Sequence, residues 1–141
     1  MLFRSFDALI EFNLVEPDAF RQALHALFGR LLADGRRRIL YKYHPVQTQP
    51  ARRAYYEEEI FGPWRDRLTF AELAITASLE DIAFSYPTVE FAIIGSSVGV
   101  YAHLCGRRVV SVARRLAELD ARFAARLALM PPIFFDTVEF V

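Results

Sequence analysis

Apolar residues recur along the chain in stretches of helical spacing that alternate with short unbroken apolar runs. The clearest helical stretch lies between residues 17 and 35. Its apolar positions, three or four residues apart, are Phe20, Leu24, Leu27, Phe28, Leu31 and Leu32. Pro17 and Asp18 suit a first helical turn, and Asp34-Gly35 suits its end. The pattern therefore predicts a helix with one buried face over these residues.

Short apolar runs predict strands on either side of this helix and further along the chain. They lie at Asp7 to Phe12, Ile39 to Tyr43, Leu68 to Phe70, Val89 to Ile94 and Val109 to Val112. The proline at position 45 stops the second strand, so His44 is expected at its carboxyl end.

Helical stretches follow most of these runs. Arg52 to Ile60 alternates charged with aromatic residues, which predicts an exposed helix that Gly62-Pro63 ends. Ser78 opens another helix with the form of a capping box, and Ser97 to Cys105 forms the next. The final helix has its apolar stripe at Leu116, Leu119, Phe123, Leu127 and Met130. The pattern assigns no element to Ile133 to Val141.

Alternation of strands with helices predicts an α/β fold, a single Rossmann-like domain over residues 1–141 with helices on both faces of a parallel sheet. In a Rossmann-like order the first strand is flanked by the second and the fourth. The loops after these three strands would then converge at the carboxyl edge, where the strand order reverses and such sheets bind ligands.

Composition narrows the class of protein. The 141 residues are 54% hydrophobic, enough for one domain with a substantial core. Basic and acidic residues number 17 each, so the chain has no net positive charge that would favour binding to nucleic acid. The single Cys105 excludes an internal disulfide framework or a cysteine metal cluster. Since neither a signal peptide nor a run of membrane-spanning length is recognisable, we expect a cytoplasmic protein.

The candidate chemistry lies where two strands end. After the fourth strand comes Gly95-Ser96-Ser97, where a helix start would present backbone N–H groups and two hydroxyls to a phosphate, and Gly95 would let the ligand approach the backbone. The alternative is that a serine there only caps its own helix. After the second strand comes Lys42-Tyr43-His44-Pro45, which contains the chain's only lysine.

Together with the loop after the first strand, these two loops would form one site. It would contain an imidazole, a flexible cation, two hydroxyls and the carboxylates of Glu16 and Asp18. These side chains suit the binding of a phosphate next to a leaving group. No serine lies in a nucleophile-elbow pattern, and no P-loop sequence occurs. Three histidines far apart in sequence, without a carboxylate cluster, predict no metal site, and we expect no cofactor.

The His-Pro and Ser-Ser pairs, with Ala102, Gly106 and Val109 to Val112 after them, resemble the nucleotide-binding half of bacterial sialyltransferases of glycosyltransferase family 52 and of capsule polysialyltransferases. The resemblance covers residues 7–113. It implies a GT-B half-domain that binds a CMP-sugar and acts in the synthesis of surface polysaccharide or lipooligosaccharide. The family's teichoic-acid relatives have an aspartate and an aromatic residue before the serines, where this chain has Ile94-Gly95.

Carried over by position, the resemblance makes His44 the group that stabilises or protonates the leaving phosphate. Lys42, Pro45, Gly95, Ser96 and Ser97 become substrate-binding residues. A general base would have to be sought in the loop after the first strand, where Glu16 and Asp18 are the candidates.

The alternative for both carboxylates is electrostatic stabilisation of a helix N-terminus. The acceptor half of a GT-B enzyme has no room in this chain, so the implied partners are a second GT-B half or another copy of the chain. Two other functions stay open: another nucleotide-sugar or polyol-phosphate transferase, and a non-catalytic binding or assembly module.

Arginines off the final helix's apolar stripe suggest a further partner. They are Arg114, Arg115, Arg122 and Arg126. A basic helix face can contact anionic lipid, which would place the protein at the surface of the inner membrane. The alternative is a solvated basic face.

Overall fold

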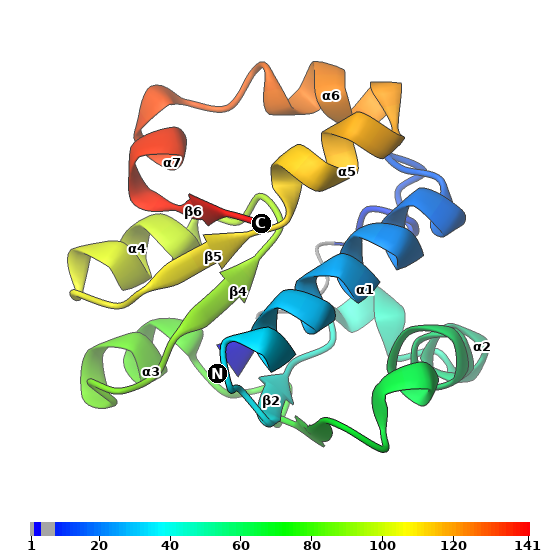
Figure 1. Cartoon of the computed structure of the whole chain (residues 1–141), viewed down its shortest axis with the longest axis horizontal. Helices are drawn as coiled ribbons and strands as arrows, with labels where there is room; N and C mark the ends of the chain where they lie inside the picture. Colours follow the sequence, from blue (N-terminus) through cyan, green and yellow to red (C-terminus); the bar gives the residue numbers. More distant parts are fainter. Residues whose placement is uncertain (1, 4–7) are drawn as a thin grey trace.

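A six-stranded parallel sheet forms the centre of the computed structural model, which describes residues 2–3 and 8–141 (Figure 1). The strands are β1 (Leu2–Phe3), β2 (Arg38–Tyr41), β3 (Thr69–Glu72), β4 (Phe91–Ile93), β5 (Val109–Ser111) and β6 (Glu139–Phe140). Their order across the sheet is β3-β2-β1-β4-β5-β6, and each neighbouring pair is parallel. The chain therefore has a mixed α/β fold, as the sequence pattern predicts.

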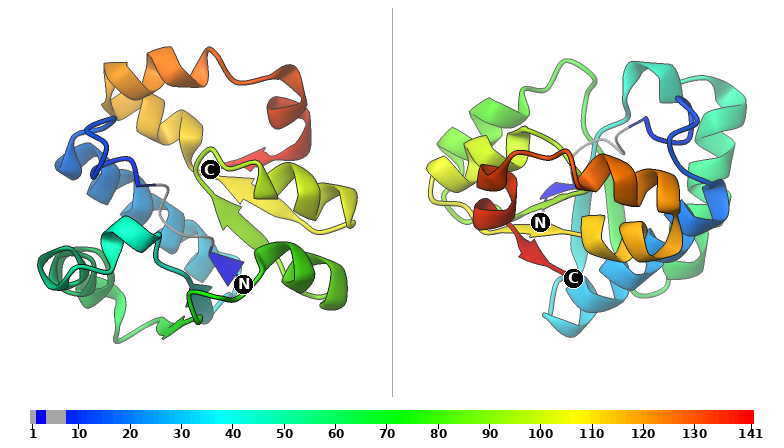
Figure 2. Two further views of the ribbon diagram at one scale, coloured as in Figure 1. Left: turned by 180° about the vertical axis from the view of Figure 1, so that it is seen from behind. Right: turned by 90° about the horizontal axis from the view of Figure 1, so that it is seen from above.

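Helices cover both faces of this sheet. The described residues form α1 (Pro17–Ala33), α2 (Pro50–Tyr55), α3 (Leu79–Ser85), α4 (Val98–Leu104), α5 (Ala113–Leu119), α6 (Ala121–Leu127) and α7 (Pro132–Thr137). Figure 2 shows α1 and α5 on the side of the sheet opposite α3 and α4. Within the part of the chain that the structure describes, no helix is long and apolar enough to cross a membrane.

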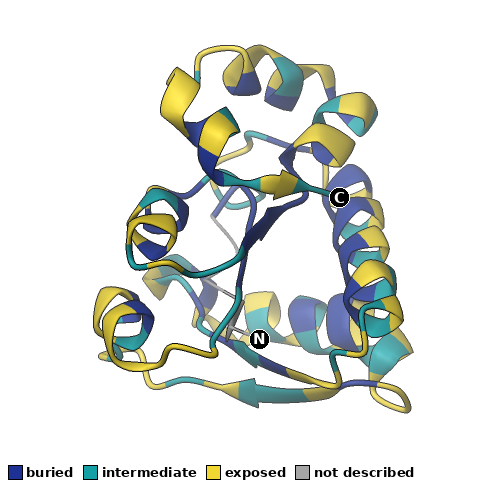
Figure 3. Cartoon of the chain, turned by 60° about the vertical axis from the view of Figure 1, so that its left-hand side comes forward, coloured by how far each residue is buried: buried dark blue, intermediate teal, exposed yellow. Residues whose placement is uncertain are grey.

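The core explains why α1 follows its sequence pattern closely. Pro17 occupies the first turn, and Gly35, with a φ of 80°, lies just beyond the helix end. The inward face of α1 is buried and its outer face exposed (Figure 3). Phe28 on this face contacts the rings of Phe61 and Phe70, so α1 packs on an aromatic cluster beside β3.

The first strand does not lie where the sequence pattern predicts it. Asp7 falls outside the described residues, and residues 8–13 form consecutive turns rather than a strand. Their backbone groups bond locally: the Phe12 amide donates to Ala8, and the Leu14 amide to Leu9. A segment that satisfies its amides internally has none to offer a neighbouring strand. The strand is instead the two-residue β1.

The helix predicted over Arg52 to Ile60 is neither regular nor fully exposed. After α2 the chain continues as a π-helical turn, Tyr56–Phe61, and then as a short 3₁₀ turn, Gly62–Trp64. Tyr56, Ile60 and Phe61 are fully buried. Hydrogen bonds that span five residues widen the turn and direct these side chains inward, although charged residues surround them in the sequence.

The predicted final helix is two helices, because Asp120 interrupts it. Asp120 has extended backbone angles, and its carboxylate accepts from the Arg122 amide at 2.8 Å and the Phe123 amide at 3.4 Å. This cap starts α6 instead of continuing α5. The unassigned tail forms α7 and β6, which adds a sixth strand beside β5.

Candidate functional site

Since the sheet is parallel throughout, the segments that follow its strands reach the same edge. Lys42 to Pro45 follows β2, and Ile94 to Ser97 follows β4, with β1 between them. Neighbouring strands lie about 4.8 Å apart, so the two segments leave the sheet roughly 10 Å apart. The topology thus brings the His-Pro and Ser-Ser segments to one edge, on either side of the strand where the order reverses.

His44 starts a short 3₁₀ turn, Pro45–Gln47, in a reciprocal capping arrangement. Its Nδ1 accepts from the Val46 amide at 3.4 Å, and the Gln47 side-chain oxygen accepts from the His44 amide at 2.8 Å. While Nδ1 accepts a hydrogen bond, a neutral imidazole carries its proton on Nε2. The loop therefore presents His44 as an Nε2 donor, with the ring of Phe12 edge-on at 6.1 Å.

Gln47 anchors this loop from inside the protein. It is fully buried, and its amide nitrogen donates to the Tyr56 hydroxyl at 2.8 Å and to a Glu11 oxygen at 3.3 Å. Burial first, and the neighbouring Glu11 second, raise the pKa of the Tyr56 hydroxyl, which stays protonated and donates to Glu11 at 3.1 Å. The position of His44 thus depends on a buried network that reaches the segment after β1.

A polar cavity of about 440 Å³ opens beside this loop, between the segments that follow β2 and β3. One wall carries Lys42, His44 and Pro45, and the other carries Thr76, Ser78 and Glu80. The Lys42 ammonium donates to the Ala77 carbonyl at 2.7 Å, which holds the two walls together. The volume lies within the ~300–1,000 Å³ range of small-molecule sites.

Ser96 and Ser97 have different surroundings. Ser96 is buried, and its hydroxyl accepts from the Val98 amide at 3.2 Å, so it holds the start of α4 in the manner of a cap. Ser97 is exposed at the N-cap position and makes no capping bond with its side chain. The capping alternative thus describes Ser96, while the Ser97 hydroxyl is accessible to a ligand.

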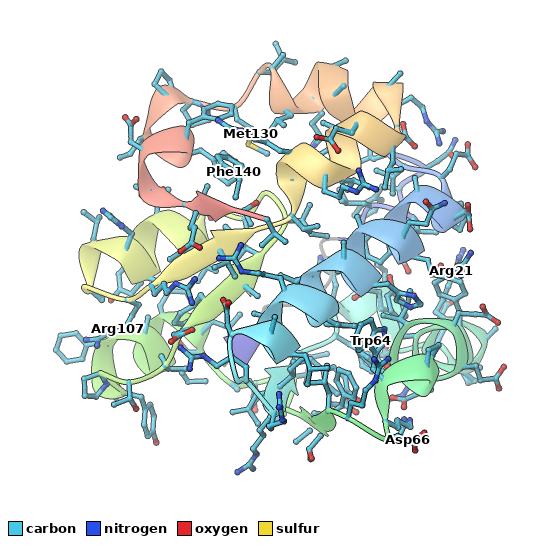
Figure 4. All side chains as sticks on the ribbon, in the orientation of Figure 1. Arg21, Trp64, Asp66, Arg107, Met130 and Phe140 are labelled. Atoms are coloured by element: carbon cyan, nitrogen blue, oxygen red, sulfur yellow. The ribbon has the colours of Figure 1, made fainter. Side chains whose placement is uncertain are left out.

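Gly95 is packed by the protein itself. A Cβ at this position would lie 2.5 Å from the Met130 methyl carbon, and Figure 4 shows Met130 between α6 and α7. Close packing by Met130 therefore accounts for a glycine here, separately from any approach of a ligand to the backbone.

Glu16 and Asp18 are already engaged near the start of α1. Glu16 pairs with Arg122 at 2.6 Å, and Asp18 pairs with Arg21 and accepts from Gln22 at 2.7 Å. The hydrogen bonds from Arg21 and then Gln22 lower the pKa of Asp18. These contacts are those of the electrostatic alternative, and neither carboxylate lines the cavity beside His44.

The cavity thus unites Lys42, His44 and Pro45 of the expected site residues, and its lining does not include Gly95, Ser96 or Ser97. Sequence reasoning missed Thr76, Glu80 and Gln47. A signal for Gln47 existed, since it follows His44 at the spacing of a capping box. Among the described residues, no group of His, Cys, Asp and Glu is arranged to hold a metal ion.

Comparisons with protein-family models, with curated proteins and with solved structures found no match. Function must therefore be inferred from the chemistry of the site. The His44 loop offers a hydrogen-bond donor and a cation at the same edge as an accessible hydroxyl, Ser97. These groups are suited to an anion of the size of a phosphate.

Proposed function

We propose that the chain is a Rossmann-like nucleotide-sugar-binding domain of a sialyltransferase-like glycosyltransferase, with a CMP-sugar as its donor. One observation carries the proposal: the His-Pro and Ser-Ser segments leave neighbouring parts of one sheet edge, on either side of β1. The strand order β3-β2-β1-β4-β5-β6 supports it, because doubly wound domains with this order bind nucleotides where the order reverses.

In this proposal the phosphate of the donor lies between His44 and Ser97. The Nε2–H of His44 donates to the phosphate oxygen that departs when the bond from the sugar's anomeric carbon to that oxygen breaks. Lys42 and the Ser97 hydroxyl offset the negative charge that collects on the departing CMP. The acceptor hydroxyl supplies the new bond to the anomeric carbon and loses its proton to a base.

The general base is the catalytic group for which this chain offers the weakest candidates. Both Glu16 and Asp18 are held in ion pairs with arginines, and the hydrogen bonds from Arg21 and Gln22 lower the pKa of Asp18, which makes Asp18 a weaker proton acceptor. We therefore assign them to the start of α1, and assign the base to the partner that brings the acceptor, a second GT-B half or another copy of the chain.

Thermal unfolding with CMP, CDP, UMP and UDP tests the proposal directly. A nucleotide at 100 times its dissociation constant adds about 2.7 kcal/mol to the free energy of unfolding. We expect CMP to raise the melting temperature more than UMP or UDP. Equal shifts for all four would reduce the site to a general phosphate site, and no shift would favour an assembly module.

A His44→Ala variant separates binding from chemistry. Transfer measured with the partner half present should fall by about 100-fold or more, with a smaller loss of CMP affinity, because the imidazole acts mainly on the departing phosphate. His25→Ala is the matched control, since His25 contacts the Glu59 carbonyl and Trp64, away from the cavity beside His44. Similar losses in both variants would contradict the role of His44.

A further inference from the structure

The strand β3 ends the sheet on one side, and its outer edge is open. No described strand lies beyond it in the order β3-β2-β1-β4-β5-β6, and Figure 1 shows β3 in green at the lower rim of the molecule. With four residues β3 is as long as β2, whereas the strand at the opposite edge, β6, has two. An open edge of this length can pair with a strand of another chain.

The hydrogen bonds to the β2 side show which backbone groups of β3 face outward. The Thr69 and Leu73 amides donate to carbonyls on that side at 2.8 Å and 2.7 Å. Since alternate residues of an edge strand bond to its one neighbour, Phe70 and Glu72 direct their amides and carbonyls away from β2. Among the described residues, no group bonds to these outward amides and carbonyls. They are therefore available to a second strand.

The side chains of β3 leave this edge accessible. Phe70 packs in the aromatic cluster beside α1, and Glu72 pairs with Arg53 of α2 at 2.5 Å, so both point to the α1 side of the sheet. Ala71, between them, points to the opposite side and is half-buried. The centre of the edge thus carries a methyl group, which lets another backbone come close.

From this arrangement we propose that a second copy of the chain pairs with β3, antiparallel about a two-fold axis, so that the two sheets join into one. In one register Ala71 lies opposite the partner's Ala71, and Phe70 lies opposite the partner's Glu72. Every outward amide of β3 then meets an outward carbonyl. A shift of two residues either places the two Glu72 carboxylates opposite each other or moves Glu72 opposite Leu68, outside the partner's strand.

A second copy suits this edge because the edge is complementary to itself in that register. The chain has no net charge, so two copies approach without overall repulsion. A pair of short strands forms an interface smaller than the roughly 1,600 Å² of stable complexes, so we expect a dimer with a dissociation constant on the order of micromolar or weaker. Residues 69–72 do not line the cavity beside His44, and the proposal is thus independent of CMP binding.

Sedimentation equilibrium of the whole chain, from about 1 µM to about 1 mM, tests for the dimer. We expect the mass to rise from that of one chain to that of two as the concentration increases. A single chain at every concentration would overturn the proposal, and growth beyond two chains would also contradict it, because a two-fold interface closes on itself.

Ala71→Cys in a Cys105→Ala background tests the register. Opposite residues that do not bond to each other in an antiparallel pair have Cα atoms about 4.5 Å apart, within the range of a disulfide. With oxidised glutathione, the two introduced thiols should form one intermolecular disulfide while glutathione is reduced to two thiols. Thr69→Cys in the same background is the matched control, because its two copies would lie about 13 Å apart along the strands.

Non-reducing electrophoresis should show the covalent dimer forming at least about tenfold faster in Ala71→Cys than in Thr69→Cys. Equal rates in the two variants would overturn the two-fold pairing at Ala71. This comparison does not depend on the strength of the dimer, since both variants are measured at the same concentration.

Glu72→Pro tests whether backbone groups hold the copies together. Proline removes the outward amide at position 72, and edge strands accept a proline whose missing N–H faces outward. The dimer should therefore dissociate about tenfold or more readily, while the melting temperature stays near that of Glu72→Ala. Glu72→Ala is the matched control, because it loses the same ion pair with Arg53 but keeps the amide. Equal dimerisation of the two variants would contradict pairing through β3.

Discussion

The turns after β2 and after β4 leave the same sheet edge, yet they differ in what occupies the space above them. Beside His44 lies a polar cavity of about 440 Å³ whose lining includes Lys42 and Glu80. Beside Ser96 the space is taken by the protein's own side chains, since Met130 packs on Gly95 and Ile93 packs on Gly99. The first turn faces an open polar cavity, and the space beside the second is largely filled already.

This difference assigns separate tasks to the two turns. A turn that the protein itself packs is rigid and can offer only its outermost group, the Ser97 hydroxyl. A turn beside a polar cavity can surround a ligand, but its geometry must be held from behind. Gln47 provides that support for His44, through bonds to Tyr56 and Glu11.

The largest expected effect tests that support. Gln47→Met keeps the length of the side chain but removes the acceptor of the half-buried His44 amide and the donor to the Tyr56 hydroxyl and the Glu11 carboxylate. Each unsatisfied buried group costs about 1–3 kcal/mol, so we expect a loss of about 2–4 kcal/mol in the free energy of unfolding. Urea denaturation measures it, with Gln49→Met in the exposed part of the same loop as the control.

A loss below about 0.5 kcal/mol, the range of ordinary surface substitutions, would show that the His44 turn is not held by Gln47. The His44 turn would then not be fixed from inside the core, and the comparison would rest on the packing of the β4 turn alone.

Next in size is the effect of Ser97 on ligand binding. Ser97→Ala should weaken CMP binding by about 1.5–3 kcal/mol, one hydrogen bond to a charged group, and leave stability unchanged because the side chain makes no capping bond. Ser96→Ala should show the reverse, a loss of about 0.5–2 kcal/mol in stability through its bond to the Val98 amide.

Calorimetric titration and thermal unfolding of the two serine variants give both quantities. If Ser97→Ala bound CMP as well as the parent, the β4 turn would serve only to start α4, and the ligand would be held from the β2 side alone.

The packing of the β4 turn can be tested at its glycines. A Cβ at position 99 would lie 2.3 Å from the end of Ile93 and 3.3 Å from Val109, in the core between α4 and the sheet. Gly99→Ala should therefore reduce the free energy of unfolding by about 1–3 kcal/mol through overpacking. Gly95→Ala should cost less, because it meets only the flexible end of Met130.

Restored stability in the double variant Gly99→Ala with Ile93→Val, measured by urea denaturation, would confirm that the clash is with Ile93. Equal stability of Gly99→Ala and the parent would show that the β4 turn is looser than its packing indicates.

Local sequence signals predict much of this fold. The α1 helix is confirmed almost to the residue, because apolar spacing, Pro17 and Gly35 all agree with the core that it packs against. The strand before His44 is confirmed, but β2 ends at Tyr41 rather than at Tyr43, and His44 caps the 3₁₀ turn that begins at Pro45. Where the local signals and the tertiary contacts agree, the pattern suffices.

The sequence pattern fails where a contact with a residue far away in the sequence determines the local structure. Asp120 reads as one more polar residue of a long helix, but its carboxylate also accepts from the Glu16 amide, 104 positions earlier, at 2.7 Å. The cavity beside His44 depends in the same way on the bond from Lys42 to Ala77, in a loop that the sequence pattern treats only as a connection. No periodicity within either segment contains that information.

The smallest expected effect concerns Asp120, which fixes the start of α6 and, beyond it, the segment whose Met130 packs on Gly95. Burial raises the pKa of its carboxyl group, but the hydrogen bonds from Glu16, Arg122 and Phe123 outweigh burial, and the pKa lies below the ordinary value of 3.8. A lowered pKa in the folded state contributes stability that is fully present above the ordinary value and is lost as the pH falls through the folded value.

The free energy of unfolding should therefore decline below about pH 4 in the parent, and less steeply in Asp120→Asn, which cannot gain that proton. Asp136→Asn is the control, because Asp136 is an exposed carboxylate on α7. Urea denaturation between pH 6 and pH 3 gives the slopes. Parallel curves for the parent and Asp120→Asn would show that the α6 cap is not ionised in the folded protein. The cover over the β4 turn would then not depend on this charge, whereas a flatter curve ties that turn to the Asp120 carboxylate and leaves the His44 side, held by Gln47, independent of it.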